Sequence, residues 1–389
     1  MRTERNHIDL VTLIAVLTLM VMSLGVVYSA GSTWADVKWE GSGKLLVMHA
    51  AKVMLGLVAI FVVMHIDYRI YRKLTKPAVL ASVALLFVTL ALGGEVKGAA
   101  RWLRLGGFGF QPSEFAKYAL MFHLCTLIAT KRDQVRDFKN GFVPMIVWIG
   151  SVTVLVLLQP NFSTGAMIFA ISMVMLFVGR AKLTHLGLTL ATLVPMLIVY
   201  MLSAEYRMHR ILAFIGGGEG SSKSNYQVLQ GIIGFGNGGI FGLGPGASRQ
   251  RDLFLPESYG DFVFSIIGEE YGLIGTLFVM AIFLAILLRG MKIARYAQDD
   301  FGRTLAFGIT ATITMYALTN AGVTLGILPT TGLPMPFVSY GGSSMFFSAI
   351  AVGVLLNISS HTDLHPRLAG APEGIRPIEP IRSLGQGES

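Results

Sequence analysis

Asp261 is the residue of this sequence whose type and position are best suited to chemistry. It lies in the stretch LFLPESYGDFVFSIIGEE, which occupies residues 253–270 and follows a glycine-rich segment. The residues after Asp261 are apolar enough to begin a membrane-spanning helix. A carboxylate at the mouth of such a helix is costly unless it binds a ligand or takes part in a reaction. We therefore predict that Asp261 is a catalytic or ligand-binding group.

Three basic residues, Arg101, Lys117 and Arg210, form a second candidate set. If the N-terminus lies in the cytoplasm, these three residues fall within the membrane or on its outer side. Cations there run against the preference of Lys and Arg for cytoplasmic loops, so they indicate an anionic ligand. Solvation of the outer loops is the alternative, and the sequence leaves both open. Trp102, next to Arg101, fits an aromatic wall for a head group as well as an ordinary interfacial tryptophan.

Glu114 and Lys117 belong to the stretch RWLRLGGFGFQPSEFAK at 101–117. Pro112 and Ser113 are typical of the first turn of a helix, which places Glu114 and Lys117 three residues apart on one helical face. Two interpretations remain open. One is a local ion pair that carries both charges into the membrane, and the other is a polar pair that contacts a ligand.

Glycines are concentrated between Gly216 and Gly246, a segment that contains IGFGNGGIFGLGPG. No GK[ST] is present, so this is not a nucleotide-binding P-loop. The glycines would let the backbone approach a ligand, let a lid move, or serve only as flexible spacing. Downstream, at least one of Glu269 and Glu270 must face the interior of a helical bundle. The three prolines of LPTTGLPMPFVSYGGSS, at 328–344, predict a rigid turn that lines a cavity.

The composition around these residues is that of a polytopic membrane protein. Of 389 residues, 53% are apolar and 14% are charged, whereas a soluble domain carries about 25% charge. Helices are predicted near 9–30, 45–66, 78–95, 112–130, 142–158, 163–179, 184–203, 262–288, 304–327 and 340–359. The predicted fold is an all-α integral membrane protein with about ten membrane-spanning helices. A large extracytoplasmic loop, at about 204–261, joins the seventh helix to the eighth.

The basic residues orient this bundle. With the N-terminus in the cytoplasm, sixteen of the 31 Lys and Arg residues fall on the cytoplasmic side, as the positive-inside rule requires. An even number of helices returns the C-terminus to the same side. The predicted domains are a membrane domain at 1–361 and a disordered cytoplasmic tail at 362–389. Because topology accounts for the formal net charge of +9, we expect no nucleic-acid partner.

Three stretches together resemble the SEDS family, the bacterial membrane proteins of shape, elongation, division and sporulation. They are RWLRLGGFGFQPSEFAK, LFLPESYGDFVFSIIGEEYGLIG and LPTTGLPMPFVSYGGSS, and the resemblance covers about residues 10–360. GPGASRQ, at 244–250, and LPTTGLPMPF look more like the division branch than the elongation branch, and the sporulation branch shares them. The chain has SYGD at 258–261, where many relatives carry a histidine-threonine pair before the aspartate.

The resemblance implies a peptidoglycan glycosyltransferase that polymerises lipid II at the outer face of the bacterial cytoplasmic membrane, at the division septum. The critical loop aspartate of the family aligns with Asp261, and its important tryptophan aligns with Trp102. The implied partners are a class B penicillin-binding protein, which supplies transpeptidation, other membrane proteins of the divisome, and membrane lipid.

The chemistry of lipid II fits these residues. The donor sugar leaves with undecaprenyl pyrophosphate, whose charge would be stabilised by Arg101, Lys117, Arg210 or a divalent cation, Mg²⁺ or Mn²⁺. One general base then suffices to deprotonate the acceptor hydroxyl, and Asp261 is our choice. Glu114 and Trp102 complete the predicted substrate-binding set. A lipid II flippase and a non-catalytic division scaffold are the alternative functions, and elongation is the alternative process.

Overall fold

The computed structural model describes residues 7–39, 42–92, 94–96, 99–105, 108–202, 208, 214, 223–251, 254–255 and 258–362. Arg210 and the predicted tail beyond residue 362 lie outside these residues. The longer helices are α1 (Leu10–Trp39), α2 (Ser42–Val63), α3 (Tyr71–Leu92), α4 (Pro112–Lys131), α5 (Val143–Leu158), α6 (Phe162–Val178), α7 (Leu183–Leu202), α9 (Lys223–Gly238), α10 (Val263–Tyr296), α11 (Asp300–Thr324) and α12 (Gly342–Ser360). Short helical turns occupy Tyr68–Ile70, Arg132–Arg136 and Phe138–Phe142.

Each of the ten predicted helical ranges overlaps one of the helices α1 to α7 or α10 to α12. Within the described residues, seven helices are long and apolar enough to span a membrane: α1, α2, α3, α5, α7, α10 and α12. Helix α6 is apolar but has 17 residues. Helices α4 and α11 are more polar and are buried along most of their length. A helix surrounded by protein need not present an apolar surface to lipid, and this explains their composition.

The surface of the bundle carries large apolar side chains, the reverse of what a protein in water presents. Leu277 and Leu284 are exposed on α10, and Met54 and Phe61 are exposed on α2. Such side chains are stable when they face lipid tails, so the exposed apolar surface agrees with a multi-pass membrane protein.

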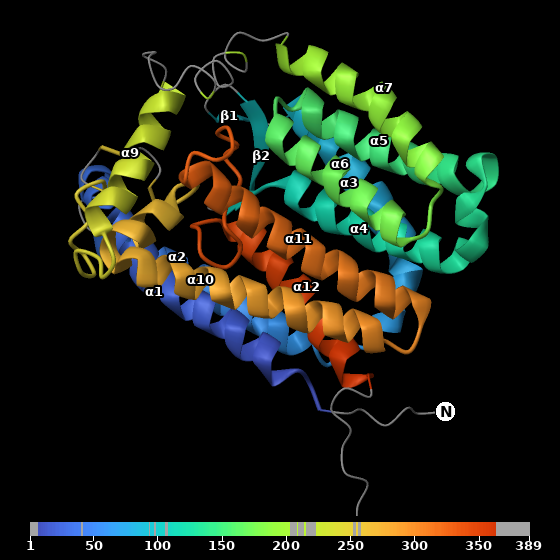
Figure 1. Ribbon diagram of the computed structural model, residues 1–389, viewed down its shortest axis with the longest axis horizontal. Coiled ribbons are helices and arrows are strands. Elements are labelled where there is room, and N and C mark those ends of the chain that lie inside the picture. The colour runs from blue at the N-terminus through green and yellow to red at the C-terminus, as the bar shows by residue number, and fades with distance from the viewer. Residues whose placement is uncertain are drawn as a thin grey trace, which may run out of the picture.

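The two ends of the bundle differ (Figure 1). At the terminal end, as we call it, α1 begins and α10 and α12 end, and the N-terminus lies there. At the loop end lie the strands, α9 and the connections that precede α10 and α12. Helix α10 packs against α1, α9 and α11, while α12 packs against α2. Helix α12 is central, because 78% of its apolar window is buried, against 11% for the peripheral α7.

A small antiparallel sheet lies at the loop end, where we predicted only helices and loops. Its strands β1 (Gly94–Val96), β2 (Ala99–Leu105) and β3 (Phe108–Phe110) neighbour one another in that order, and Leu103 pairs with Phe110. The segment between α3 and α4 carries four charged residues and many glycines, so it does not form another membrane-spanning helix, and its backbone groups are satisfied by strand pairing. The all-α prediction is corrected by this sheet.

Part of the predicted outer loop is also helical. Helix α9 lies within the glycine-rich segment and packs on α10. A Cβ at Gly231 would lie 2.9 Å from Ser265 Oγ, and a Cβ at Gly238 would lie 2.0 Å from the carbonyl oxygen of Gly268. These two glycines allow two helices to approach closely, as small residues do between membrane helices. For Gly231 and Gly238, close packing of α9 on α10 therefore replaces the three interpretations given above, which were approach to a ligand, movement of a lid and flexible spacing.

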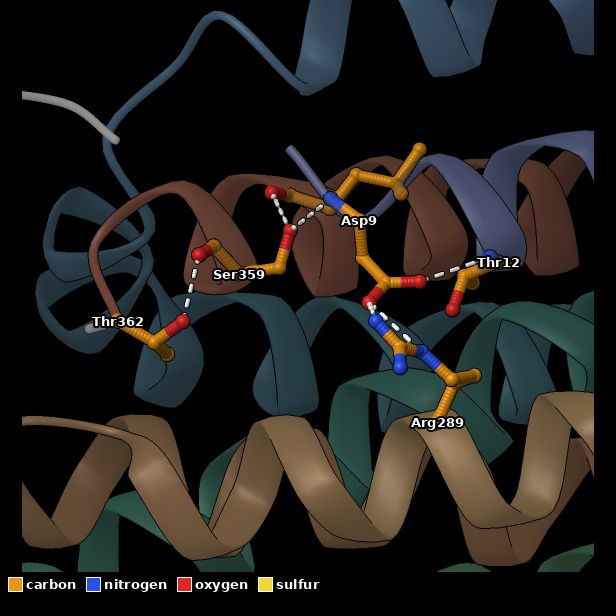
Figure 2. Close-up of polar contacts among 6 residues, drawn as sticks. Asp9, Thr12, Arg289, Ser359 and Thr362 are labelled. Carbon is orange, nitrogen blue, oxygen red and sulfur yellow. Dashed lines mark hydrogen bonds and ion pairs between the residues drawn. The ribbon is translucent and has the colours of Figure 1, made fainter. Parts of the chain in front are cut away.

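At the terminal end, a polar cluster joins three helices (Figure 2). Asp9, whose side chain is fully buried, accepts hydrogen bonds from Arg289 Nε at 2.9 Å and from Thr12 N at 2.8 Å. Its own backbone N donates to Ser359 Oγ at 3.0 Å, and Thr362 Oγ1 donates to the carbonyl oxygen of Ser359 at 2.7 Å. The cluster therefore fastens the start of α1 to α10 and α12.

Candidate active site at the loop end

Asp261 lies in the turn that precedes α10, and its side chain is partly exposed. Asn320 of α11 fixes this turn, because its Nδ2 donates to the carbonyl oxygens of Asp261 and Leu333, each at 2.8 Å. Gly332 has a φ of +71°, and a Cβ there would lie 3.2 Å from Asp261 Oδ2. The carboxylate therefore lies against the 328–341 connection, where a left-handed backbone and close approach favour glycine.

Two tyrosines connect the Asp261 turn to the start of α12. Tyr340 N donates to the carbonyl oxygen of Tyr259 at 2.9 Å, and the two ring centroids are 5.6 Å apart. The ring of Trp34, in α1, lies 5.0 Å from that of Tyr259. Burial raises the pKa of Tyr259 to about 12, and the charges of Tyr340 and Asp261 add to this shift. Tyr259 is therefore protonated at neutral pH and available as a hydroxyl donor.

Lys52 and His49 of α2 both contact Tyr340, and our sequence reasoning missed both. Lys52 Nζ lies 3.3 Å from the centroid of the Tyr340 ring. The ring of His49 lies 5.5 Å from that of Tyr340, and His49 Nε2 is 3.0 Å from Ser23 Oγ. A signal was present in the sequence, because a lysine and a histidine inside a membrane-spanning helix are rare without a purpose.

Glu114 and Lys117 form the ion pair that one of our two interpretations predicted. Lys117 Nζ lies 2.7 Å from Glu114 Oε2, and each side chain is 3% exposed. The same ammonium lies 3.9 Å from the centroid of the Tyr316 ring, so α11 covers the pair. A contact between this pair and substrate stays a prediction. The geometry places the pair inside the bundle, near the start of α4.

Arg101 and Trp102 belong to β2. Arg101 Nε donates to the carbonyl oxygen of Gln159 at 3.3 Å, and its Nη2 contacts that of Pro160, so the guanidinium lies on the α5–α6 turn. The Trp102 ring lies over Gly109, where an added Cβ would be 3.3 Å away. Their predicted substrate contacts remain predictions, as does that of Arg210, which lies outside the described residues.

The strands are attached to the start of α12. Gln111 N donates to Ser343 Oγ at 3.0 Å, and Ser343 Oγ donates to the carbonyl oxygen of Gly109 at 3.3 Å. Ser343 follows Tyr340 by three residues. The structure therefore brings the Trp102 strands, the Asp261 turn and the 328–341 connection to one end of the bundle.

Glu269 and Glu270 are both buried, which confirms that at least one faces the interior. Glu269 accepts a hydrogen bond from Gln250 N at 3.2 Å and another from Ser248 Oγ. Glu270 accepts a hydrogen bond from Ser29 Oγ. Both carboxylates therefore hold the preceding turn and α1 against α10. Their role in the site is structural.

Within the described residues, no group of three or more His, Cys, Asp or Glu side chains could hold a metal ion. Mg²⁺ is commonly held by one or two carboxylates together with substrate phosphates. Asp261 is the carboxylate that fits such a shared site, and the ion would there neutralise charge on a phosphate leaving group. A divalent cation at this position stays a prediction.

A family model described as "Cell cycle protein", which covers FtsW, RodA and SpoVE, matches residues 9–364. A probable peptidoglycan glycosyltransferase FtsW of Geobacter metallireducens is 38% identical over 372 residues, which are 95% of this chain and 97% of the relative. Stage V sporulation protein E of Bacillus subtilis is 35% identical over 364 residues, which are 93% of this chain and 100% of the relative.

Two solved structures share the fold. One, from a study of how a peptidoglycan synthase complex coordinates polymerization and crosslinking, aligns with a TM-score of 0.74 at 26% identity, over 90% of this chain and 97% of that one. The other is the rod shape determining protein RodA of Thermus thermophilus, with a TM-score of 0.67 at 24% identity, over 90% and 96% of the two chains.

Proposed function

Because the chain belongs to the FtsW/RodA/SpoVE family of cell cycle proteins, we propose that it is a peptidoglycan glycosyltransferase that polymerises lipid II. Relatives named FtsW carry this activity in their names, and a chain of a peptidoglycan synthase complex shares the fold. The proposed role is in septal synthesis during division, since the Geobacter FtsW relative is more similar to this chain than the Bacillus sporulation protein.

The observation that carries the proposal is the placement of Asp261. The carboxylate is partly exposed at the loop end, while Asn320 and Gly332 define the position of its turn. A general base needs this combination of access and fixed geometry. The carboxylates of Glu269 and Glu270 are buried and occupied with structural hydrogen bonds, so neither is as well placed to reach a sugar.

In the proposed reaction, the 4-hydroxyl oxygen of the acceptor sugar forms a bond to the anomeric carbon of the donor. The bond from that carbon to the pyrophosphate oxygen breaks, and undecaprenyl pyrophosphate leaves with the electron pair. Asp261 takes the hydroxyl proton. One carboxylate suffices, because pyrophosphate leaves without the protonation that an alkoxide requires. Direct displacement on an α-linked donor gives a β-linked product.

The proposed topology places the loop end outside the cell and both termini in the cytoplasm. Ten helices, α1 to α7 and α10 to α12, would span the membrane, with α4, α6 and α11 added to the seven whose length and composition suffice. The polyprenyl tail of lipid II would lie in the bilayer, along the apolar exterior of the bundle. The proposed partners are a class B penicillin-binding protein and other divisome membrane proteins, and the proposed location is the septum.

The test is polymerisation of lipid II by the purified chain together with its penicillin-binding partner. The active serine of the partner is blocked, so that only glycan polymerisation is scored on a gel. We expect long glycan from the wild type and none from Asp261→Asn. Asp36→Asn is the matched control, because Asp36 is an exposed aspartate at the end of α1 and its substitution should leave activity unchanged.

Each other outcome has a defined meaning. Equal product from wild type and Asp261→Asn would show that the general base is a residue other than Asp261. No product from the wild type, beside an active control enzyme, would favour the flippase or scaffold function. Measurement of lipid II exposure across proteoliposome membranes then separates these two, because a scaffold moves no lipid.

A further inference from the structure

Lys52 is a cation in the interior of the bundle, and within the described residues it has no hydrogen bond or ion pair. It lies midway along α2, and its side chain is partly buried. The contact recorded for its ammonium group is with the face of the Tyr340 ring, at 3.3 Å from the centroid. A Cβ at Gly342 would lie 3.5 Å from Lys52 Cδ and Cε, so the start of α12 packs along the lysine stem.

Three other described cations that are not exposed have partners that satisfy them. Lys117 lies 2.7 Å from Glu114, Arg289 is paired with Asp9, and Arg101 donates to two carbonyl oxygens. A charged side chain inside a membrane protein is expensive without a counter-charge. A cation–π contact recovers part of that cost and leaves the remaining N–H groups of the ammonium free to bind an anion.

Lys52 is connected to the candidate catalytic turn by a short series of contacts. The Tyr340 ring under its ammonium packs edge to face on Tyr259, with centroids 5.6 Å apart. Tyr340 N donates to the Tyr259 carbonyl oxygen, and Tyr259 precedes Asp261 by two residues. His49 packs on Tyr340 as well, at 5.5 Å between centroids. The cation therefore lies on the Tyr340 ring, beside the turn that carries the proposed base.

We propose that Lys52 is a substrate-binding residue whose ammonium group, positioned by the Tyr340 ring, contacts the diphosphate of the lipid-linked sugar. This inference rests on the proposed function and deepens it by naming an anion-binding residue on α2. A diphosphate offers several oxygens to one ammonium, and a lysine binds it as a point charge. The phosphate of an anionic phospholipid has the same chemistry, so the experiment must separate the two sources.

The experiment measures kinetics and binding on the full-length chain in complex with its penicillin-binding partner. The variants are Lys52→Met, which keeps the length of the side chain without its charge, and Lys52→Arg, which keeps the charge. Lys44→Met is the matched control, because Lys44 is an exposed lysine two turns earlier on the same helix. Binding of dansylated lipid II is measured in an Asp261→Asn background, in which substrate binds without turnover.

We expect Lys52→Met to raise both the KM and the Kd for lipid II by about tenfold or more, the effect of losing one charge-assisted hydrogen bond. Lys52→Arg should stay within about threefold of the wild type, and Lys44→Met within about twofold. Inorganic pyrophosphate should compete with lipid II for the wild type and compete more weakly for Lys52→Met. A second variant, Tyr340→Leu, removes the ring and should raise Kd in the same direction, whereas Tyr340→Phe keeps the ring face and should not.

Two results would overturn the inference. A fall in kcat of Lys52→Met with KM and Kd unchanged would make Lys52 a support for the Tyr340 turn only. A change in the binding of phosphatidylglycerol nanodiscs, with an unchanged Kd for lipid II, would assign the residue to membrane lipid. If the wild type makes no glycan, the proposed polymerase function fails, and the Kd of dansylated lipid II still decides whether Lys52 binds the diphosphate.

Discussion

The two ends of the bundle use charged residues in opposite ways. At the terminal end, both carboxylate oxygens of Asp9 are occupied, by Arg289 and by the backbone of Thr12, and the group is sealed from solvent. At the loop end, Asp261 is partly exposed, and Lys52 contacts an aromatic ring and, among the residues that the structure describes, no carboxylate. A closed ion pair holds helices together, whereas charges left accessible in a membrane protein are available to a ligand.

The 328–341 connection at the loop end has unusual backbone geometry. In the 328–341 connection, Gly332 and the buried Phe337 both have positive φ, at +71° and +63°. A non-glycine residue in that region is strained, and such strain persists only where the surrounding structure imposes it. Irregular backbone at this depth is tolerated because protein surrounds it. The predicted rigidity of this turn and its lining of a cavity stay predictions.

The largest expected effect comes from Asp261→Asn. Loss of a general base should lower the rate of glycan polymerisation by about 10²–10⁴-fold. The thermal unfolding midpoint in detergent should stay near the wild-type value, because the turn is held by backbone contacts to Asn320 rather than by that carboxylate alone. If the variant loses activity only in proportion to its loss of folded protein, then Asp261 has a structural role like that of Asp9, and the proposed difference between the two ends is wrong.

Asp9→Asn is the opposite case. It should destabilise the fold by roughly 3–5 kcal/mol, because it leaves the partly buried Arg289 without its carboxylate. A loss of about 3 kcal/mol, the lower end of this range, is expected because the side chain of Arg289 is 21% exposed. Denaturant unfolding in mixed micelles measures this, and activity per folded molecule should be unchanged. The double variant Asp9→Asn with Arg289→Met should recover part of the loss, since neither charge then remains.

Asn320→Ala should affect both properties, and so it sharpens the comparison. The substitution leaves the carbonyl oxygens of Asp261 and Leu333 without their shared donor. Each unsatisfied buried group costs about 1–3 kcal/mol. We expect a lower unfolding midpoint together with a fall in kcat. A lower midpoint with normal kcat would show that the turn keeps its position without Asn320.

Gly332→Ala tests the fit beside the carboxylate. Alanine at a φ of +71° costs about 1–2 kcal/mol, and its Cβ would press on Asp261 Oδ2. The expected result is a mild loss of stability and a larger loss of polymerisation rate. Gly25→Ala is the matched control, because a Cβ at Gly25 meets nothing within 4 Å, so both stability and activity should be preserved.

Ser359→Ala should have the smallest effect. Its hydroxyl accepts from Asp9 N at the terminal end, and a hydrogen bond between membrane helices contributes about 0.6 kcal/mol. A small shift of the unfolding midpoint with unchanged glycan synthesis is expected. A measurable loss of polymerisation would indicate that the terminal end communicates with the loop end.

Much of the site could be proposed from the sequence because its residues stand out locally. Asp261 follows a loop and precedes an apolar helix, and the spacing of Glu114 and Lys117 already indicated an ion pair. The small sheet and α9 could not be predicted in the same way. The strands pair with their neighbours in the chain, but they are only three to seven residues long, so their pattern does not stand out. The close contact of Gly238 with Gly268 depends on a neighbour that lies elsewhere in the chain.

The sequence by itself determined the class of the protein, the ranges of its long helices and the position of its candidate base. Each of these depends on a local property, because a bilayer selects apolar helical segments of sufficient length wherever they occur in a chain. Only the tertiary structure decided which charged side chains are paired with an opposite charge and which stay accessible to a ligand. Lys117 has Glu114 on its own helix, but Lys52 reaches Tyr340 and the Asp261 turn only because α2 packs against α12. Contacts between segments so far apart in the chain depend on helix packing, which hydropathy does not encode.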